Sequence, residues 1–148
     1  MSLVWVAIVA ALVLMGAVWA ARGRRRSARA KEARAVAEEL LPEIRALMES
    51  SDPKGVSDGE PALAHHYEAY RQRLPQVFPK EYLFAVETFY QCVESYREAR
   101  TFMSDSFDEG IAPSLGDRIR AKDLRDRCLK DVYYTGDAAA QKLERMIG

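Results

Sequence analysis

The sequence has little of what catalytic, metal-binding and disulfide-stabilised proteins need. Its 148 residues include two cysteines and two histidines. Small disulfide scaffolds are rich in cysteine, and structural zinc sites need several spaced Cys and His ligands. Because His65 and His66 are adjacent, their side chains would point about 100° apart on a helix. We therefore expect neither a metal site nor a cofactor.

Motifs for phosphate binding and nucleophilic catalysis are also missing. The segments around Gly55, Gly59 and Gly110 lack both the spacing of a phosphate-binding loop and a preceding strand. Cys92 and Cys128 lie beside apolar residues, where a free cysteine is ordinarily a small buried hydrophobe. A Cys–His pair brought together by folding stays open, but nothing local supports one. The sequence predicts a protein that is not an enzyme, with no catalytic residue assigned; an enzyme with a hidden site is an alternative.

Charge is absent from residues 3–21, which include nine Leu, Ile or Val residues. As a helix, these 19 residues would be about 28 Å long, close to the thickness of a bilayer's hydrocarbon core. Trp5 and Trp19 lie near the two ends, where aromatic rings prefer the headgroup region. No tryptophan follows Trp19. We therefore predict that residues 1–21 form a transmembrane anchor.

A cleaved signal peptide is the alternative interpretation of this segment. Signal peptides place basic residues before a shorter apolar stretch. Here the basic residues follow the apolar stretch instead, in residues 22–35, which hold seven basic residues and one acidic residue. This order favours an uncleaved anchor.

The basic segment, residues 22–35, also predicts orientation. By the positive-inside rule, the N-terminus lies outside the cell's inner (plasma) membrane and the C-terminal domain lies in the cytoplasm. Basic residues at this position attract anionic lipid headgroups. No aromatic residues alternate with them to stack bases, so we expect no nucleic acid. The predicted membrane-interface residues are Trp5, Trp19, Arg22, Arg24, Arg25, Arg26 and Arg29.

Small residues recur along one face of the predicted span. Such faces let membrane helices approach one another closely, which predicts a candidate surface for homo-oligomers. The alternative is that alanine merely fills the span. The residues of this candidate face are Ala7, Ala10, Ala17 and Ala21.

Residues 36–148 read as a cytoplasmic helical bundle. Val36, Leu40, Ile44 and Leu47 recur at helical spacing, with Leu41 and Met48 beside them. The anchor could continue into this helix as one rod, with a kink or restart at Pro42. Further helices are expected from a capping box at Ser57–Glu60, over 80–104 and after Ser114. No segment alternates like a strand. The predicted fold is all-α: one transmembrane helix followed by about four antiparallel helices.

The later helices have identifiable apolar faces. In the second, His66 or Tyr67 joins the face, and Pro75 and Pro79 bracket a break that holds Val77 and Phe78. In the third, Phe84, Tyr90 and Phe102 widen the face, and a gap from 105 to 113 follows. Gly136 marks either a break in the last helix or a close helix contact. The faces comprise Leu63, Tyr70 and Leu74; Tyr82, Val86, Phe89, Val93, Tyr96 and Met103; and Leu129, Val132, Ala139, Leu143 and Met146.

Seven tyrosines occur in a region with little leucine. A tyrosine ring packs while its hydroxyl stays wet, which is common at interfaces and pocket rims. The alternative is a tyrosine-rich core in which each hydroxyl finds a partner. The candidate partner or pocket surface is Tyr67, Tyr70, Tyr96, Tyr133 and Tyr134.

Together these features predict a membrane-anchored interaction or scaffold module. Its expected partners are anionic lipid headgroups and either another protein or a second copy of the chain. Confinement to one membrane would raise the effective concentration of such partners. A membrane-disrupting or pore-forming effector, such as a toxin, holin-like or defence protein, is an alternative, although the span lacks a polar lining.

Overall fold

Helices make up all the regular secondary structure that the structure describes. The computed structural model describes residues 3–50, 64–108 and 114–148, with backbone alone for 3–11 and 102–108. The prediction of an all-α fold is confirmed for these residues. The helices are α1 (Leu3–Ser50), α2 (His65–Tyr70), α3 (Leu74–Val77), α4 (Lys80–Asp108) and α5 (Leu115–Ile147).

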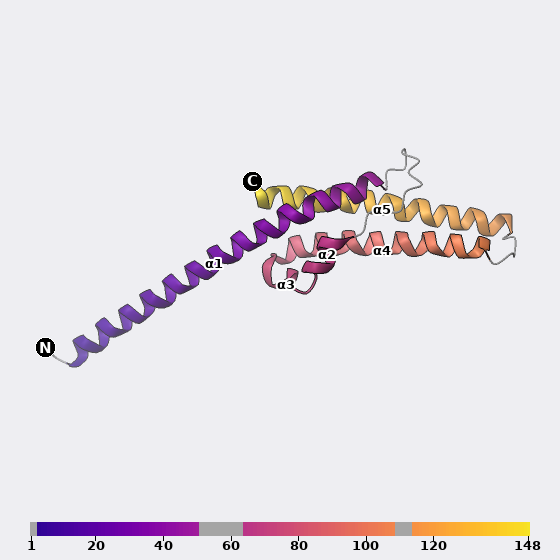
Figure 1. Ribbon diagram of the computed structural model, residues 1–148. Coiled ribbons are helices and arrows are strands. Elements are labelled where there is room, and N and C mark those ends of the chain that lie inside the picture. Colours follow the sequence, from indigo (N-terminus) through magenta and orange to yellow (C-terminus); the bar gives the residue numbers. More distant parts are fainter. Residues whose placement is uncertain (1–2, 51–63, 109–113) are drawn as a thin grey trace.

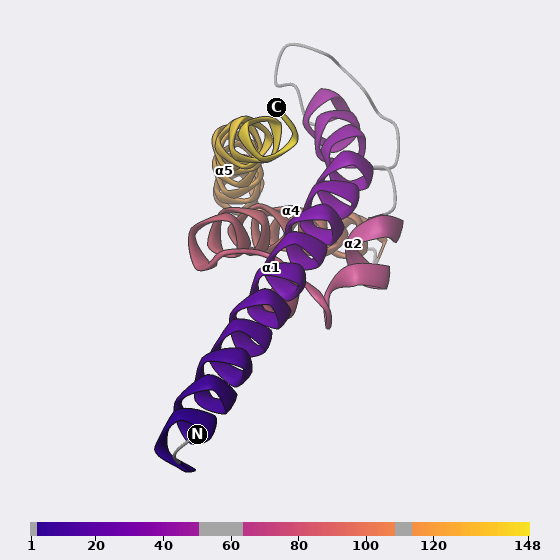
Figure 2. The same ribbon diagram turned by 90° about the vertical axis from the view of Figure 1, so that its left-hand side faces the viewer.

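Helix α1 is one uninterrupted rod of 48 residues. At 1.5 Å per residue it is about 72 Å long. Its N-terminal half projects alone, and its C-terminal half packs on the body (Figures 1 and 2). The predicted continuous rod is therefore present, and a restart at Pro42 is wrong. Pro42 is exposed, so the carbonyl of Glu38, which loses its N–H partner to the proline, lies on the solvent side.

The body is built around three long helical segments. Helices α4 and α5 form an antiparallel hairpin, and the packed half of α1 lies along α5 (Figure 1). The predicted apolar faces on these helices form the core. Their fully buried members include Leu40, Ile44 and Leu47 of α1, Val86 and Phe89 of α4, and Val132, Ala139 and Leu143 of α5.

The second predicted helix is instead two short helices, α2 and α3, separated by a turn at residues 71–73. Tyr67 is buried and His66 is exposed, which settles the choice left open on this face. The break expected between Pro75 and Pro79 is α3 itself, and Val77 and Phe78 are buried as expected. Over the described residues, the bundle thus consists of three long helical segments and two short helices, where about four antiparallel helices were predicted. The predicted helix start at 57–61 and Leu63 lie outside the described residues.

Helix α4 is longer than predicted and continues to Asp108, so residues 105–108 of the expected gap are helical. Residues 109–113 lie outside the described residues. Phe84 is 71% exposed, so its predicted place on the apolar face is wrong. Tyr90 is buried as expected. Phe102 and Met103 lie outside the described side chains.

Helix α5 begins at the predicted cap. The Ser114 hydroxyl accepts a hydrogen bond of 3.2 Å from the Asp117 N–H. The helix passes through Gly136 without a break. A Cβ atom there would lie 2.5 Å from Cγ of Met48 and 2.9 Å from Cε2 of Phe89. Gly136 therefore permits the close contact of α5 with α1 and α4. Of the two predicted alternatives, the close helix contact is confirmed and the break is wrong.

Candidate functional site

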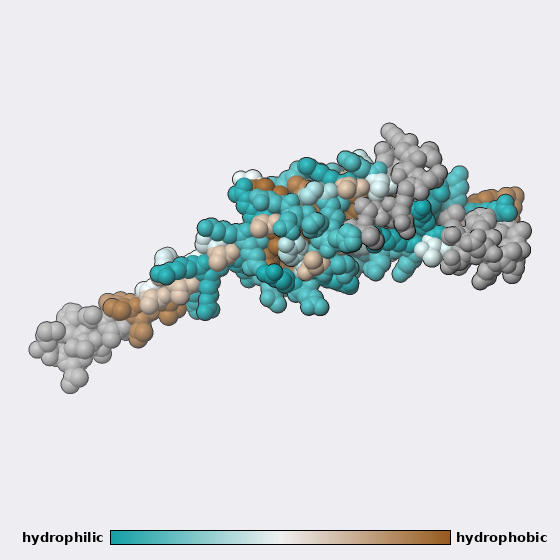
Figure 3. Space-filling model, in the orientation of Figure 1, coloured by the Kyte–Doolittle hydropathy of each residue, from teal (hydrophilic) through white to brown (hydrophobic). Residues whose placement is uncertain are grey.

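The projecting half of α1 presents apolar side chains on every side. Leu12, Val13, Leu14 and Met15 are each between 59% and 66% exposed. Consecutive positions on a helix differ by about 100°, so these four residues cover the whole circumference. Figure 3 shows a brown, hydrophobic stretch on the projecting rod, which paler and then teal residues separate from the polar body. A helix that is apolar all round ordinarily lies in a large core or in a membrane.

The predicted span falls only partly within the described side chains. Among those side chains, no helix offers an apolar stretch long enough to cross a membrane. Trp5, Ala7 and Ala10 lie outside them. Ala17 and Ala21 are exposed, and the structure does not bring this candidate oligomer face against another helix.

The predicted interface arginines follow the apolar stretch and precede Ala33, the first buried residue of the core. Trp19 is 81% exposed. All the arginines are exposed, namely Arg22, Arg24, Arg25, Arg26 and Arg29. Two of them, Arg26 and Arg29, share a face of α1 with the buried stripe.

These two arginines line a groove of about 510 Å³, which we call the arginine groove. Its other walls come from α3, the start of α4 and the end of α5. The remaining lining residues are Ala30, Ala33, Val77, Pro79, Tyr82 and Met146. Near this wall, the Lys142 ammonium lies 5.7 Å from the centre of the Tyr82 ring. The groove therefore joins an apolar floor to a basic rim.

A buried carboxylate fastens α2 to α1. Glu43 is 8% exposed. It accepts hydrogen bonds from the backbone N–H groups of His66 (2.7 Å) and Tyr67 (3.2 Å) and from the Tyr90 hydroxyl (2.6 Å). The first-turn N–H groups of a helix need such acceptors. Ala64, the residue before α2, supplies no side-chain cap. Glu43 thus caps α2 from another helix.

Sequence reasoning missed Glu43, although a signal was present. Val36, Leu40, Glu43 and Leu47 follow steps of four, three and four residues, so a carboxylate occupies a core position of the stripe. A charged residue at a core position must find hydrogen-bond partners when it is buried. Those partners come from α2 and α4, which sequence alone does not place.

Tyr67 and Tyr90 complete this cluster. Their rings are stacked with centres 3.8 Å apart. Burial, and then the hydrogen bond to Glu43, raises the pKa of Tyr90 well above its ordinary value of 10.0. Burial also raises the pKa of Tyr67. The two phenols therefore stay neutral and serve the packing of α2 against α4.

The five candidate tyrosines lie on three different helices and are not brought together as one surface. Tyr67 is buried in the Glu43 cluster, and Tyr96 is half-buried. Tyr70 donates a hydrogen bond of 2.7 Å to Glu39, which raises the pKa of the Tyr70 hydroxyl. Tyr133 and Tyr134 are 46% and 71% exposed, and their rings meet edge to face. The most exposed pair is therefore on α5.

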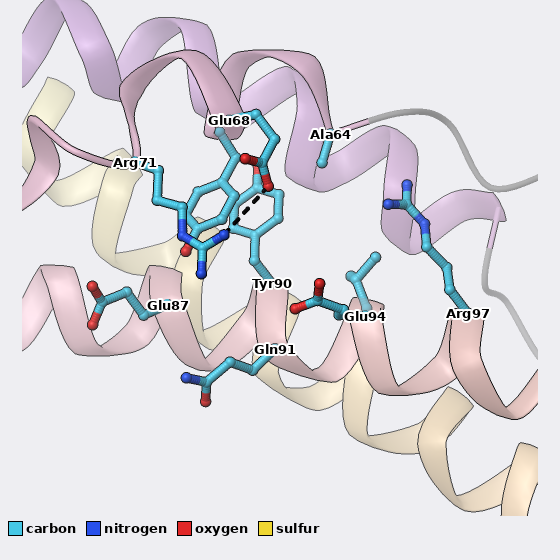
Figure 4. A pocket seen from close by; sticks show the side chains of 10 residues that line it. Ala64, Glu68, Arg71, Glu87, Tyr90, Gln91, Glu94 and Arg97 are labelled. Atoms are coloured by element: carbon cyan, nitrogen blue, oxygen red, sulfur yellow. Dashed lines mark ion pairs between the residues drawn. The ribbon is translucent and has the colours of Figure 1, made fainter.

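A second, polar hollow of about 190 Å³ lies between α2 and α4 (Figure 4). Glu68 and Arg71 form an ion pair of 3.8 Å at its edge. Glu87, Glu94 and Arg97 also line it. Because charges of both signs line this hollow, its electrostatics favour no single class of ligand.

The cysteines and histidines show no reactive arrangement in the described part of the chain. His65 and His66 are exposed, and Cys92 and Cys128 are half-buried. Burial, followed by the charge of Asp131, raises the pKa of the Cys128 thiol. A nucleophilic cysteine needs a lowered pKa instead. The described side chains contain no cluster of His, Cys, Asp and Glu suited to a metal ion.

Comparison of the chain with protein families, with curated proteins and with solved structures found no match. Over the described residues, the chain is an all-α protein of three long and two short helices. One of the long helices, α1, extends beyond the body.

Proposed function

We propose that this protein is a single-pass membrane protein whose helical body acts as an interaction module on the cytoplasmic face. One observation carries the proposal: α1 is a single helix that exposes apolar side chains all round at residues 12–15, in the part that projects, and is amphipathic where it packs. A rigid connection of this kind would fix the body at a set distance from the bilayer.

The energetics of the projecting half support the anchor. Each Leu, Ile or Val near the centre of a span favours the bilayer by roughly 0.3–0.6 kcal/mol. Left in water, the same side chains would be an exposed apolar surface without a partner. The basic segment, residues 22–35, follows the apolar stretch, which favours an N-terminus outside and a cytoplasmic body.

The proposed interaction surface is the outer face of α5. Leu115 and Ile119 are 76% and 53% exposed and lie one turn apart, so they adjoin each other. Tyr133 and Tyr134 are also exposed on α5, about 21 Å farther along the helix. Exposed apolar patches with polar rims mark protein contacts. The partner would be a protein on the same membrane or a second copy of the chain.

The topology is tested by a reporter that is active only in the cytoplasm, fused after Gly148, together with extraction of membranes in alkaline carbonate. The proposal predicts an active reporter and a chain that stays with the membrane. An inactive reporter on a fusion that is made at full length, or a chain released by carbonate, would contradict it.

The interaction surface is tested by a photo-crosslinking amino acid in the full-length protein in native membranes. Placed at Ile119, it should give a discrete adduct, because this side chain faces the proposed partner. Placed at Glu98, an exposed position on α4 and not on α5, it should give none. Equal adducts at both positions, or none at Ile119, would refute the surface.

A further inference from the structure

The arginine groove includes Met146, near the C-terminal end of α5. Figure 1 shows that α1 projects from the same end of the body. Arg26 and Arg29 are five and eight residues beyond Ala21, the end of the proposed span. At 1.5 Å per residue, they lie about 7.5 and 12 Å beyond it along the axis. The headgroup layer of a bilayer is roughly 5–8 Å thick on each side. Arg26 therefore lies at the outer edge of this layer, and Arg29 lies a few ångström beyond it. If the proposed anchor is correct, on which this inference rests, the groove opens just outside the headgroup layer, and a lipid bound in it is drawn partly out of the bilayer.

The chemistry of the groove matches one kind of molecule. None of the described residues that line it is acidic. Two guanidinium groups suit a phosphate, which arginine binds with paired hydrogen bonds. The floor, which includes the buried residues Ala33 and Val77, suits a hydrocarbon chain. The volume of about 510 Å³ is in the range of small-molecule sites, which runs from about 300 to 1,000 Å³.

We propose that the arginine groove binds one anionic phospholipid, with its phosphate between Arg26 and Arg29 and an acyl chain along the apolar floor. This differs from general attraction of the basic segment to a charged surface. Arg24 and Arg25 belong to the same segment but do not line the groove. General attraction makes all four arginines equivalent, whereas a groove makes only one pair essential.

The test uses the full-length protein in detergent micelles, titrated with phosphatidylglycerol or phosphatidylcholine, with bound lipid counted by native mass spectrometry. We expect one phosphatidylglycerol per chain and weaker binding of phosphatidylcholine. Each basic residue contributes about 1 kcal/mol, so R26Q/R29Q should weaken binding by about tenfold or more. The matched variant R24Q/R25Q loses the same charge and should weaken it by less than about threefold.

A variant that keeps every charge isolates the groove itself. Ala30 is an exposed residue of the groove wall, so A30F should fill the groove and reduce binding as strongly as R26Q/R29Q. Thermal melting by circular dichroism checks that it folds; if it does not, the two arginine pairs decide alone. Equal losses from both pairs, equal binding of the two lipids, or full binding by folded A30F would each overturn the proposal.

Failure of the anchor and failure of the groove remain distinguishable. A micelle contains no bilayer to span, so its lipid titration does not depend on topology. The reporter and carbonate experiment tests the anchor alone. Selective binding with a contradicted topology would refute the anchor and support the groove, and the reverse pattern would refute only the groove.

Discussion

The two halves of α1 share one backbone helix and differ in how they distribute apolar side chains. In the packed half, Leu40, Ile44 and Leu47 are at most 1% exposed and lie on one face. In the projecting half, Leu12 to Met15 are each more than half exposed and face all directions. A helix with an apolar stripe on one face buries that stripe against neighbouring helices. A helix that is apolar around its whole circumference needs an apolar environment on all sides, which a bilayer would supply.

The difference shows that forming a helix and stabilising the fold are separate matters. Helical backbone forms in both halves, but only the packed half contributes to a protein core. The basic segment lies between them, and Ala33, near its C-terminal end, is the first buried residue of the core. Substitutions matched between the two halves therefore test this division.

The largest effect is expected from removing a large side chain in each half. Leu40→Ala deletes a fully buried side chain, which costs about 2–5 kcal/mol of unfolding free energy. Leu14→Ala is the matched change in the projecting half and should leave the stability of the body unchanged. Denaturant unfolding of the full-length protein in micelles measures both. Equal losses would show that the projecting half packs on the body.

The second effect concerns the hydrogen bond that only the packed half makes, between Glu43 and the Tyr90 hydroxyl. Tyr90→Phe removes it and should cost about 1.5–3 kcal/mol at neutral pH, because the acceptor is a charged carboxylate. The conservative control Tyr82→Phe changes a half-buried tyrosine outside this cluster.

The same variant predicts a pH dependence. The pKa of Tyr90 is raised in the folded state, so the folded protein holds a proton that the unfolded chain releases above pH 10.0. The contribution of Tyr90 is therefore complete below about pH 10 and is lost above it, by about 1.4 kcal/mol per pH unit. Unfolding free energies from about pH 8 to about pH 11 should converge for wild type and Tyr90→Phe. A constant difference would contradict the raised pKa.

A smaller effect is expected at the two glycines that differ most in their surroundings. Gly136→Ala places a methyl group against Met48 and Phe89. Overpacking costs about 1–3 kcal/mol and exceeds the gain in helix propensity of about 1 kcal/mol. Gly16→Ala meets nothing within 4 Å and should not destabilise the body. Melting temperatures measure both, and a stabilised Gly136→Ala variant would refute the close contact.

The smallest effect is expected for an ion pair on the surface of the packed half. Arg45 and Glu144 join α1 to α5 with a nitrogen–oxygen distance of 2.5 Å, but both side chains are about half exposed. Exposed pairs of this kind contribute about 0–1 kcal/mol. Glu144→Gln should lower the unfolding free energy within that range, and high salt should abolish the difference. A larger, salt-resistant loss would mean that this contact is a main fastening of α1.

The periodic features of this sequence were predictable, because burial of a helix leaves its mark at steps of three and four residues. The stripe from Val36 to Leu47 and the seam around Gly136 are of this kind, as is the cap at Ser114. The split of the second helix was not, because the turn at residues 71–73 depends on how α2 is held by Glu43 from α1.

The candidate site was predictable only as composition. Arg26 and Arg29 were predicted at the membrane interface, but only together with the other arginines of the basic segment. The groove beside them also needs Val77 and Met146, which come from distant parts of the chain. Likewise, Tyr134 is exposed and Tyr67 is buried, a difference that follows only from the positions of α5 and α2 in the fold. Tertiary packing, which one sequence does not reveal, decides both points.

The central claim is that the projecting half of α1 lies in a bilayer while the body does not. Trp5 and Trp19 are the only tryptophans, so tryptophan fluorescence, excited selectively over that of the tyrosines, reports on this half alone. In vesicles that contain brominated lipids, the account predicts blue-shifted emission and strong quenching. Emission typical of water, with no quenching by the brominated lipids, would contradict it.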